Sequence, residues 1–188
     1  FFTEFANPSK IVYSWNRALP ASRVAFGQDN VALYVGFASE YALLTLQNPN
    51  LNFSIAIIPQ IKNTSHASTF GRMYAFAIPR ASANPTGAMS AALILAGAEP
   101  SRLLWMASGL ASPRRDVLSL PREGETAAES VIRDSAIIAR AWLDPDPLKS
   151  EAVFKGMIDD AVSGAARLSE AVQHAERELT SLLDVYDK

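Results

Sequence analysis

The sequence lacks cysteine and contains only two histidines in 188 residues. Without cysteine, the chain can form no disulfide, no thiolate zinc site and no thiol nucleophile. His66 and His174 are far apart in sequence, and neither has a second histidine three or four residues away, which is the spacing of a helical metal pair. We therefore expect no bound metal ion and no cofactor.

Excess charge of one sign and long apolar runs are also missing. The 17 basic and 19 acidic residues give a net charge of −2, which argues against a dedicated nucleic-acid-binding protein because such proteins usually carry a basic footprint. No stretch approaches the ~18 apolar residues that a membrane helix needs. The longest candidate, 88–98, is interrupted by Gly97 and followed by Glu99 and Pro100.

The motifs of common enzymes are absent as well. The chain has no GxSxG elbow, no GxxxxGK[ST] loop and no GxGxxG fingerprint. Asp144 and Asp146 fit a proline turn, and Asp159 and Asp160 fit the polar flank of a helix, better than either pair fits acid–base catalysis. We expect no catalytic residue and no enzymatic activity.

The composition itself is that of an ordinary globular protein, with 49% hydrophobic and 19% charged residues. The length suits one large domain or parts of two. Three short apolar runs bounded by turn residues, 31–35, 52–58 and 70–78, predict buried β-strands. A helix is predicted over 38–47, and Gly71 predicts a bulge or a bend in the third strand.

The rest of the chain, 84–188, predicts helices. Asn84 is placed to cap a helix that begins with Pro85. Other helices are predicted over 99–108 and 125–140, followed by a closing pair whose first member ends at Ser163 and Gly164. The second member carries an amphipathic stripe made of Leu168, Val172, Ala175, Leu179, Leu182 and Tyr186. Strands with intervening and following helices indicate an α/β layer architecture.

Several aromatic residues stand at or near the ends of these predicted elements. They are Trp15, Phe37, Tyr74, Trp105 and Trp142. Aromatic faces pack against sugar rings while polar neighbours bind the hydroxyls. Apolar neighbours assign Trp105 to the core, whereas a core role and a binding role stay open for Trp15 and Trp142. Arg72 could donate to ligand oxygens, with an ordinary solvated charge as the alternative.

A series of short motifs gives the chain a familiar order. The motifs occupy 26–36, 48–60, 70–79, 84–88, 109–116 and 142–147. In this order they resemble the extracellular solute-binding proteins of ABC importers, the maltose-binding-like family 1. The resemblance covers nearly the whole chain. Family members are longer and have two lobes, so the chain resembles their C-terminal half, with the N-terminal half of the same protein missing.

The resemblance implies an α/β fold that is part of a type II periplasmic-binding-protein fold, with a short sheet flanked by helices and a helical C-terminal region. Residues 1–70 would form the sheet-containing part of the C-terminal lobe. Residues 71–118 would cross the hinge into the other lobe, and residues 119–188 would return as helices. Apolar surface meant for the missing half would be exposed, so we expect self-association, a second chain in contact or poor solubility of the isolated chain.

The function implied by the resemblance is capture of a small solute between two closing lobes, with delivery to an ABC permease in the membrane. Sugars or oligosaccharides are the commonest solutes of the family. The location would be extracytoplasmic, either periplasmic or extracellular and anchored through an upstream signal. The candidate ligand-binding residues are Trp15, Phe37, Ser39, Arg72, Tyr74 and Trp142.

An alternative function is a helical protein-interaction module without a small-molecule ligand. Residues 126–188 motivate it, because the stripe of the last helix could face a partner chain.

Overall fold

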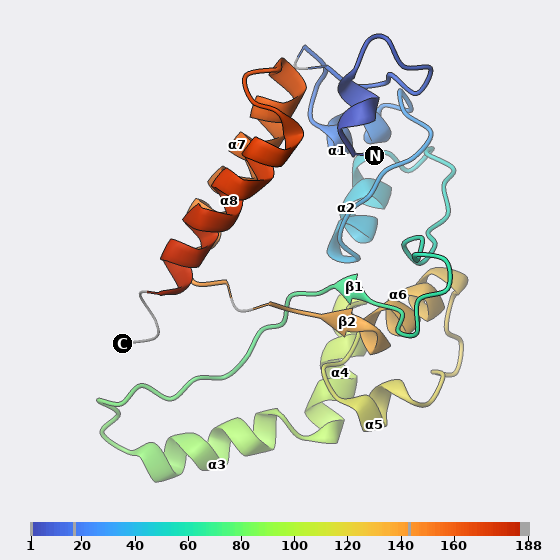
Figure 1. Ribbon diagram of the computed structural model, residues 1–188. Helices are drawn as coiled ribbons and strands as arrows, with labels where there is room; N and C mark the ends of the chain where they lie inside the picture. Colours follow the sequence, from blue (N-terminus) through green and yellow to red (C-terminus); the bar gives the residue numbers. More distant parts are fainter. Residues whose placement is uncertain (1, 17, 143, 185–188) are drawn as a thin grey trace. The chain divides into compact units, whose positions relative to one another are not determined.

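The computed structural model describes residues 2–16, 18–142 and 144–184 (Figure 1). It is mostly helical, with a short two-stranded parallel sheet, which is compatible with an α/β or a helical class. The chain divides into two compact units, one made of residues up to Pro20 together with Trp142 onward and the other of Ala21–Ala141. No helix in the described ranges is both long enough and apolar enough to cross a membrane.

The elements follow one another in this order. They are η1 (Phe2–Ala6), α1 (Ser22–Gly27), α2 (Ser39–Gln47), β1 (Thr69–Phe70), α3 (Pro85–Leu95), α4 (Ala98–Ser108), α5 (Arg115–Leu118), α6 (Ala127–Ile137), β2 (Ala139–Arg140), α7 (Pro147–Ser163) and α8 (Leu168–Leu183).

The first unit is built on the hairpin of α7 and α8 (Figure 1). The Asp146 carboxylate caps α7 by accepting from the Lys149 amide at 3.2 Å, and Gly164 ends the helix at a φ of 75°, which favours glycine. These features confirm the predicted pair. On α8 the buried residues are Ala171 and Ala175.

In the second unit, α1 and α2 pack around an aromatic cluster. Phe26 stacks on Tyr34 with ring centroids 5.6 Å apart and meets Phe53 edge-on at 5.5 Å. The Asn48 amide donates to the Gly27 carbonyl oxygen at 2.9 Å, which ties the end of α2 to the end of α1. Edge-to-face and offset-stacked aromatic pairs add stability beyond the area that they bury.

The helices α3 to α6 confirm most of the local sequence signals. The Asn84 side chain accepts from the Gly87 amide at 2.9 Å, and Pro85 is the first residue of α3. Gly109 ends α4 at a φ of 68°. Trp105 is 3% exposed and lies in the core, as predicted, together with Leu118 of α5 and Ile132 of α6.

The sheet is smaller than predicted. Thr69 of β1 pairs with Ala139 of β2, and Phe70 pairs with Arg140, in parallel. The prediction of strands over 31–35 and 52–58 is wrong, because the structure describes both segments completely and finds no strand in either. Only the start of 70–78 pairs.

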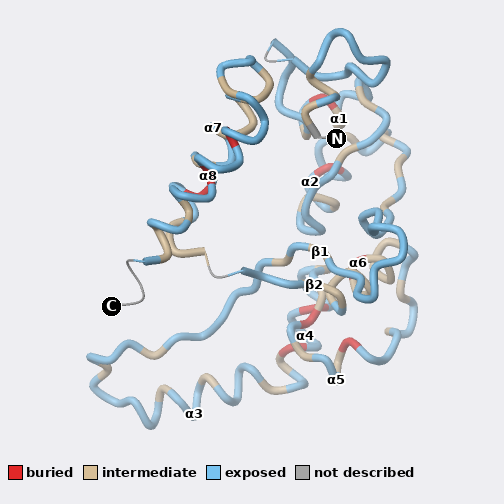
Figure 2. Tube along the Cα trace, in the orientation of Figure 1, coloured by how far each residue is buried: buried red, intermediate tan, exposed pale blue. Residues whose placement is uncertain are grey.

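The reason for this error is that β-pairing needs a partner from elsewhere in the chain, and an apolar run does not supply one. Most residues of these segments are exposed (Figure 2). The end of the predicted helix 125–140 is also wrong. Ala139 and Arg140 leave the helix and form β2.

Gly71 explains how β1 approaches β2. A Cβ atom at this position would lie 2.9 Å from the Ala139 Cβ, a distance that ordinary side chains do not tolerate. The Gly71 amide donates to the Arg140 carbonyl oxygen at 3.0 Å. The glycine that predicted a bulge or a bend therefore serves close contact between two strands.

Candidate functional site

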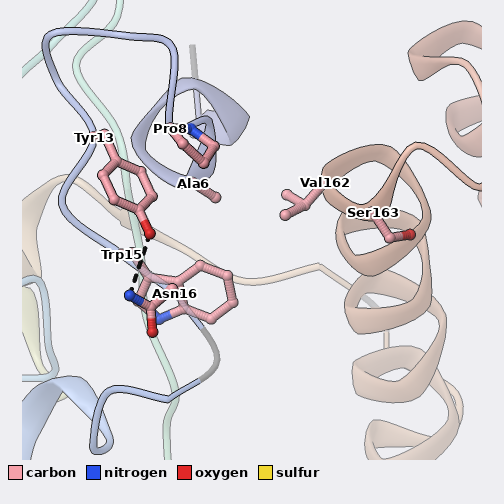
Figure 3. A pocket seen from close by; sticks show the side chains of 7 residues that line it. All are labelled: Ala6, Pro8, Tyr13, Trp15, Asn16, Val162 and Ser163. Carbon is pink, nitrogen blue, oxygen red and sulfur yellow. Dashed lines mark hydrogen bonds between the residues drawn. The ribbon is translucent and has the colours of Figure 1, made fainter.

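A pocket of about 360 Å³ lies in the first unit. Its wall combines residues of η1 and the loop that follows with residues at the end of α7 (Figure 3). The lining residues are Ala6, Pro8, Tyr13, Trp15, Asn16, Val162 and Ser163. Of the predicted site residues, Trp15 lines this pocket.

Backbone hydrogen bonds hold the loop that carries the aromatic side chains. The amides of Ser14 and Trp15 both donate to the Phe5 carbonyl oxygen, at 2.9 and 3.1 Å. The Tyr13 amide donates to the Lys10 carbonyl oxygen at 3.1 Å. The loop is thus fastened to η1 directly after Tyr13 and closed on itself before it, which limits the positions that its rings can take.

The side chains of this loop combine apolar faces with polar tips. Tyr13 is 38% exposed and Trp15 is 40% exposed, so part of each ring remains available to a ligand. The Asn16 Nδ2 donates to the Tyr13 hydroxyl at 3.2 Å (Figure 3), and the Asn16 Oδ1 accepts from the Ala18 amide at 2.9 Å. The tyrosine hydroxyl keeps its own proton for donation to a ligand oxygen.

A second group of predicted site residues meets in the other unit. The Arg72 guanidinium lies over the Phe37 ring, 5.1 Å from its centroid, and 5.9 Å from the centroid of Phe70. The two rings are 6.0 Å apart and tilted by 60°. We call Phe37, Phe70 and Arg72 the arginine–aromatic cluster. Phe70 was not among the predicted site residues, although it stands two positions before Arg72.

The backbone at Phe37 is fixed by Glu40. The Glu40 Oε2 accepts from the Phe37 amide at 2.8 Å and from the Tyr34 hydroxyl at 2.9 Å. Burial, together with the hydrogen bond and the charge of Glu40, raises the pKa of Tyr34 to about 12. Tyr34 therefore stays a neutral donor at physiological pH, and the start of α2 keeps its geometry.

The remaining predicted site residues lie apart from these two groups. Ser39 is exposed and opens α2, two residues after Phe37. Trp142 packs edge-on against Phe154 with centroids 6.3 Å apart. Tyr74 is 98% exposed. Residues Val162 and Ser163 of the pocket were missed, because only the fold brings the end of α7 to the loop of Trp15.

Within 2–16, 18–142 and 144–184 no group of three or more histidine, aspartate or glutamate side chains is placed to hold a metal ion. Neither the comparison with protein-family models nor the comparison with curated proteins found a match.

Proposed function

We propose that this chain is part of a solute-binding protein that captures a small solute between two lobes and delivers it to an ABC importer. The solute would be a sugar or an oligosaccharide. The order of the motifs from 26–36 to 142–147 supports this proposal. The observation that carries it is the pocket in which Tyr13 and Trp15 offer ring faces beside the polar Asn16.

The chemistry of this pocket suits a sugar. The apolar face of a sugar ring packs on an indole or phenol, and its hydroxyls exchange hydrogen bonds with a phenol hydroxyl or an amide. The pocket volume of about 360 Å³ is near the lower end of the range of about 300–1,000 Å³ for small-ligand sites. We therefore favour one or two sugar rings over a long oligosaccharide as the occupant.

The finer architecture belongs to the same proposal. The chain would contribute part of a type II periplasmic-binding-protein fold, divided at 1–70, 71–118 and 119–188, with Phe37, Ser39, Arg72, Tyr74 and Trp142 as further ligand contacts. Its location would be extracytoplasmic. Its partners would be the solute, the N-terminal half of the same protein and a membrane permease, with no nucleic acid.

The large solvent-exposed surface area of the chain supports the proposal that another part of the same protein covers it. The chain exposes 14501 Å², whereas two compact units of these sizes would expose about 10,500 Å² in total even without touching. The surplus of about 4,000 Å² exceeds the roughly 800 Å² that each partner buries in a standard interface. Another part of the same protein would cover such a surface in the proposed architecture.

Calorimetric titration with a panel of mono- and disaccharides tests the proposal, using both this chain and the longer protein that contains it. We expect at least one sugar to bind, and Trp15→Ala to weaken that binding at least tenfold. Phe76→Ala is the matched control, since Phe76 is an exposed aromatic residue outside the pocket. Binding of no sugar, or equal binding by Trp15→Ala, would overturn the proposal.

A second candidate function is the helical interaction module. It is favoured by Leu168 and Val172 of α8, which are 61% and 47% exposed, although apolar residues of an amphipathic helix normally face a core. Sedimentation separates the two functions. Under this alternative Leu168→Glu abolishes association with a partner chain, whereas Trp15→Ala does not.

A further inference from the structure

The arginine–aromatic cluster brings a cation to a defined place on the second unit. Phe37 precedes α2, Phe70 belongs to β1 and Arg72 follows it. The guanidinium rests over both rings, at 5.1 and 5.9 Å from their centroids. Cation–π contacts of this kind contribute about 0.5–1 kcal/mol at exposed sites. They restrict the long arginine side chain, so less freedom is lost when its donors bind an acceptor.

This cation has no carboxylate partner among the described residues. Ion pairs connect Arg23, Arg102, Arg114, Arg122 and Arg133 with acidic side chains. Arg72 takes part in none of the ion pairs within those residues. The sequence gives a reason for this difference, because 41–98 contains no aspartate and no glutamate, whereas it contains Lys62, Arg72 and Arg80.

A second arginine lies on the same side of the two strands. Arg140 pairs with Phe70 in the parallel register, and residues in register share a face of the sheet. Arg72 stands just beyond the end of β1, and its contact with the Phe70 ring places its guanidinium on the Phe70 side. The Arg140 side chain donates to the Ala139 carbonyl oxygen at 2.8 Å and pairs with no acid in the described part of the chain.

We infer that the arginine–aromatic cluster of the second unit itself binds the anionic group of an acidic sugar, which makes an acidic sugar a better ligand of this chain than a neutral one. The planar guanidinium fork matches the two oxygens of a carboxylate and also accepts a phosphate. Phe37 and Phe70 hold the fork in place, and Arg140 adds positive potential on the same face. This inference rests on the proposed function, since it specifies the class of solute.

The test is a calorimetric comparison of galactose, galacturonate and glucose 6-phosphate, at low and at physiological salt. We expect galacturonate to bind at least tenfold more tightly than galactose, with a preference that shrinks as salt rises because the cluster is exposed. The phosphate arm distinguishes a carboxylate site from a general oxoanion site, and tight binding of either acidic sugar supports the inference.

Substitutions of Arg72 test whether this residue causes the preference for galacturonate over galactose. Arg72→Gln is expected to lower the ratio of the affinities for galacturonate and galactose at least tenfold, and Arg72→Lys to restore part of it. Arg80→Gln is the matched control, since Arg80 lies in the same acid-free stretch, and should leave the ratio unchanged.

The results of these titrations distinguish failure of the acidic-sugar inference from failure of the proposed solute-binding function. If galactose binds as tightly as both acidic sugars, or Arg72→Gln keeps the preference, the inference is overturned while the proposed function stands. If no sugar of any kind binds, both are overturned.

Discussion

Two regions of the second unit differ in how far their apolar residues are buried. The helical region 98–137 buries Trp105, Leu118 and Ile132. The extended region 51–80 has no buried residue at all, and there Tyr74 is 98% exposed. Both regions are rich in apolar residues. The difference therefore comes from whether each region finds its partners nearby in the chain.

Helices obtain their hydrogen bonds from residues four positions away, and their ends are specified by single residues. Extended segments obtain theirs from distant segments, whose position no local signal encodes. Region 98–137 contains its own helices, caps and ion pairs. Region 51–80 forms strand pairs at Thr69 and Phe70, and the rest of this fully described region has no strand.

The largest expected effect comes from removing the centre of the helical core. Trp105 is buried, and the Arg122 guanidinium lies 5.8 Å from its ring centroid. We expect Trp105→Ala to lower the free energy of unfolding by about 3–5 kcal/mol, because it leaves a large cavity. Denaturant titration measures the change. A loss below about 1 kcal/mol would mean that 98–137 is no better packed than the extended region.

The contrast between the two regions also shows what the sequence could reveal about the fold. Asn84 with Pro85, Gly109 and Gly164 marked helix ends correctly, because the groups that they satisfy lie within a few residues. The apolar residues of 31–35 and 52–58 indicated a preference for strand, but they did not specify a second segment with which to pair. The parallel contact of Thr69 with Ala139 spans most of the unit, and no local pattern could have predicted it.

The second prediction concerns the contact between the extended region and β2, which directly follows the helical region. Gly71→Ala would put a methyl group 2.9 Å from the Ala139 Cβ, so we expect β1 and β2 to separate at a cost of about 1–3 kcal/mol. Hydrogen exchange should report faster exchange of the Gly71-position amide, which now donates to Arg140. Unchanged protection would show that the strand pair does not require glycine. Ser68→Ala is the control one residue before β1.

The third prediction uses pH to probe a local cap. The pKa of Glu129 lies below the usual value of 4.5, mainly because its carboxylate accepts a hydrogen bond from the Thr126 amide. The Thr126 hydroxyl and Arg122 lower this pKa further, whereas burial raises it. A folded pKa below the unfolded one gives stability that is complete above about pH 4.5 and is lost as pH falls through the folded value. We expect Glu129→Gln to cost about 1 kcal/mol at pH 7.

The measurement is the free energy of unfolding of the wild type and of Glu129→Gln between pH 3 and pH 7. The difference between the two proteins should shrink as pH falls below about 4.5. Glu123→Gln serves as the control, because Glu123 is exposed. A difference that stays constant with pH would assign the effect to something other than the carboxylate charge.

The smallest effect is expected in the extended region. Tyr74→Ser should change the free energy of unfolding by no more than about 0.5 kcal/mol, because the side chain is almost fully solvated. The same variant should lower the binding of an apolar dye. A stability loss above about 1 kcal/mol would show that Tyr74 is covered, for instance by the self-association that we expect of this chain.

In the candidate sites, too, residues could be predicted from their sequence neighbours, whereas their contacts with distant residues could not. Trp15 could be singled out from its polar neighbours Ser14 and Asn16. Its opposite wall, Val162 and Ser163, lies on α7 and could not be. Phe37 and Arg72 were predicted separately, and only the fold shows the guanidinium over the ring.

Nuclear magnetic resonance of the tryptophan indoles tests the central claim most directly. The chain has three tryptophans, whose indole N–H signals can be assigned by single Trp→Phe variants. Titration with a sugar that binds is predicted to shift the Trp15 signal, while the signal of the buried Trp105 stays in place. Binding that leaves the Trp15 signal unmoved, or a sugar panel that moves none of the three signals, would contradict the assignment of the pocket as a solute site.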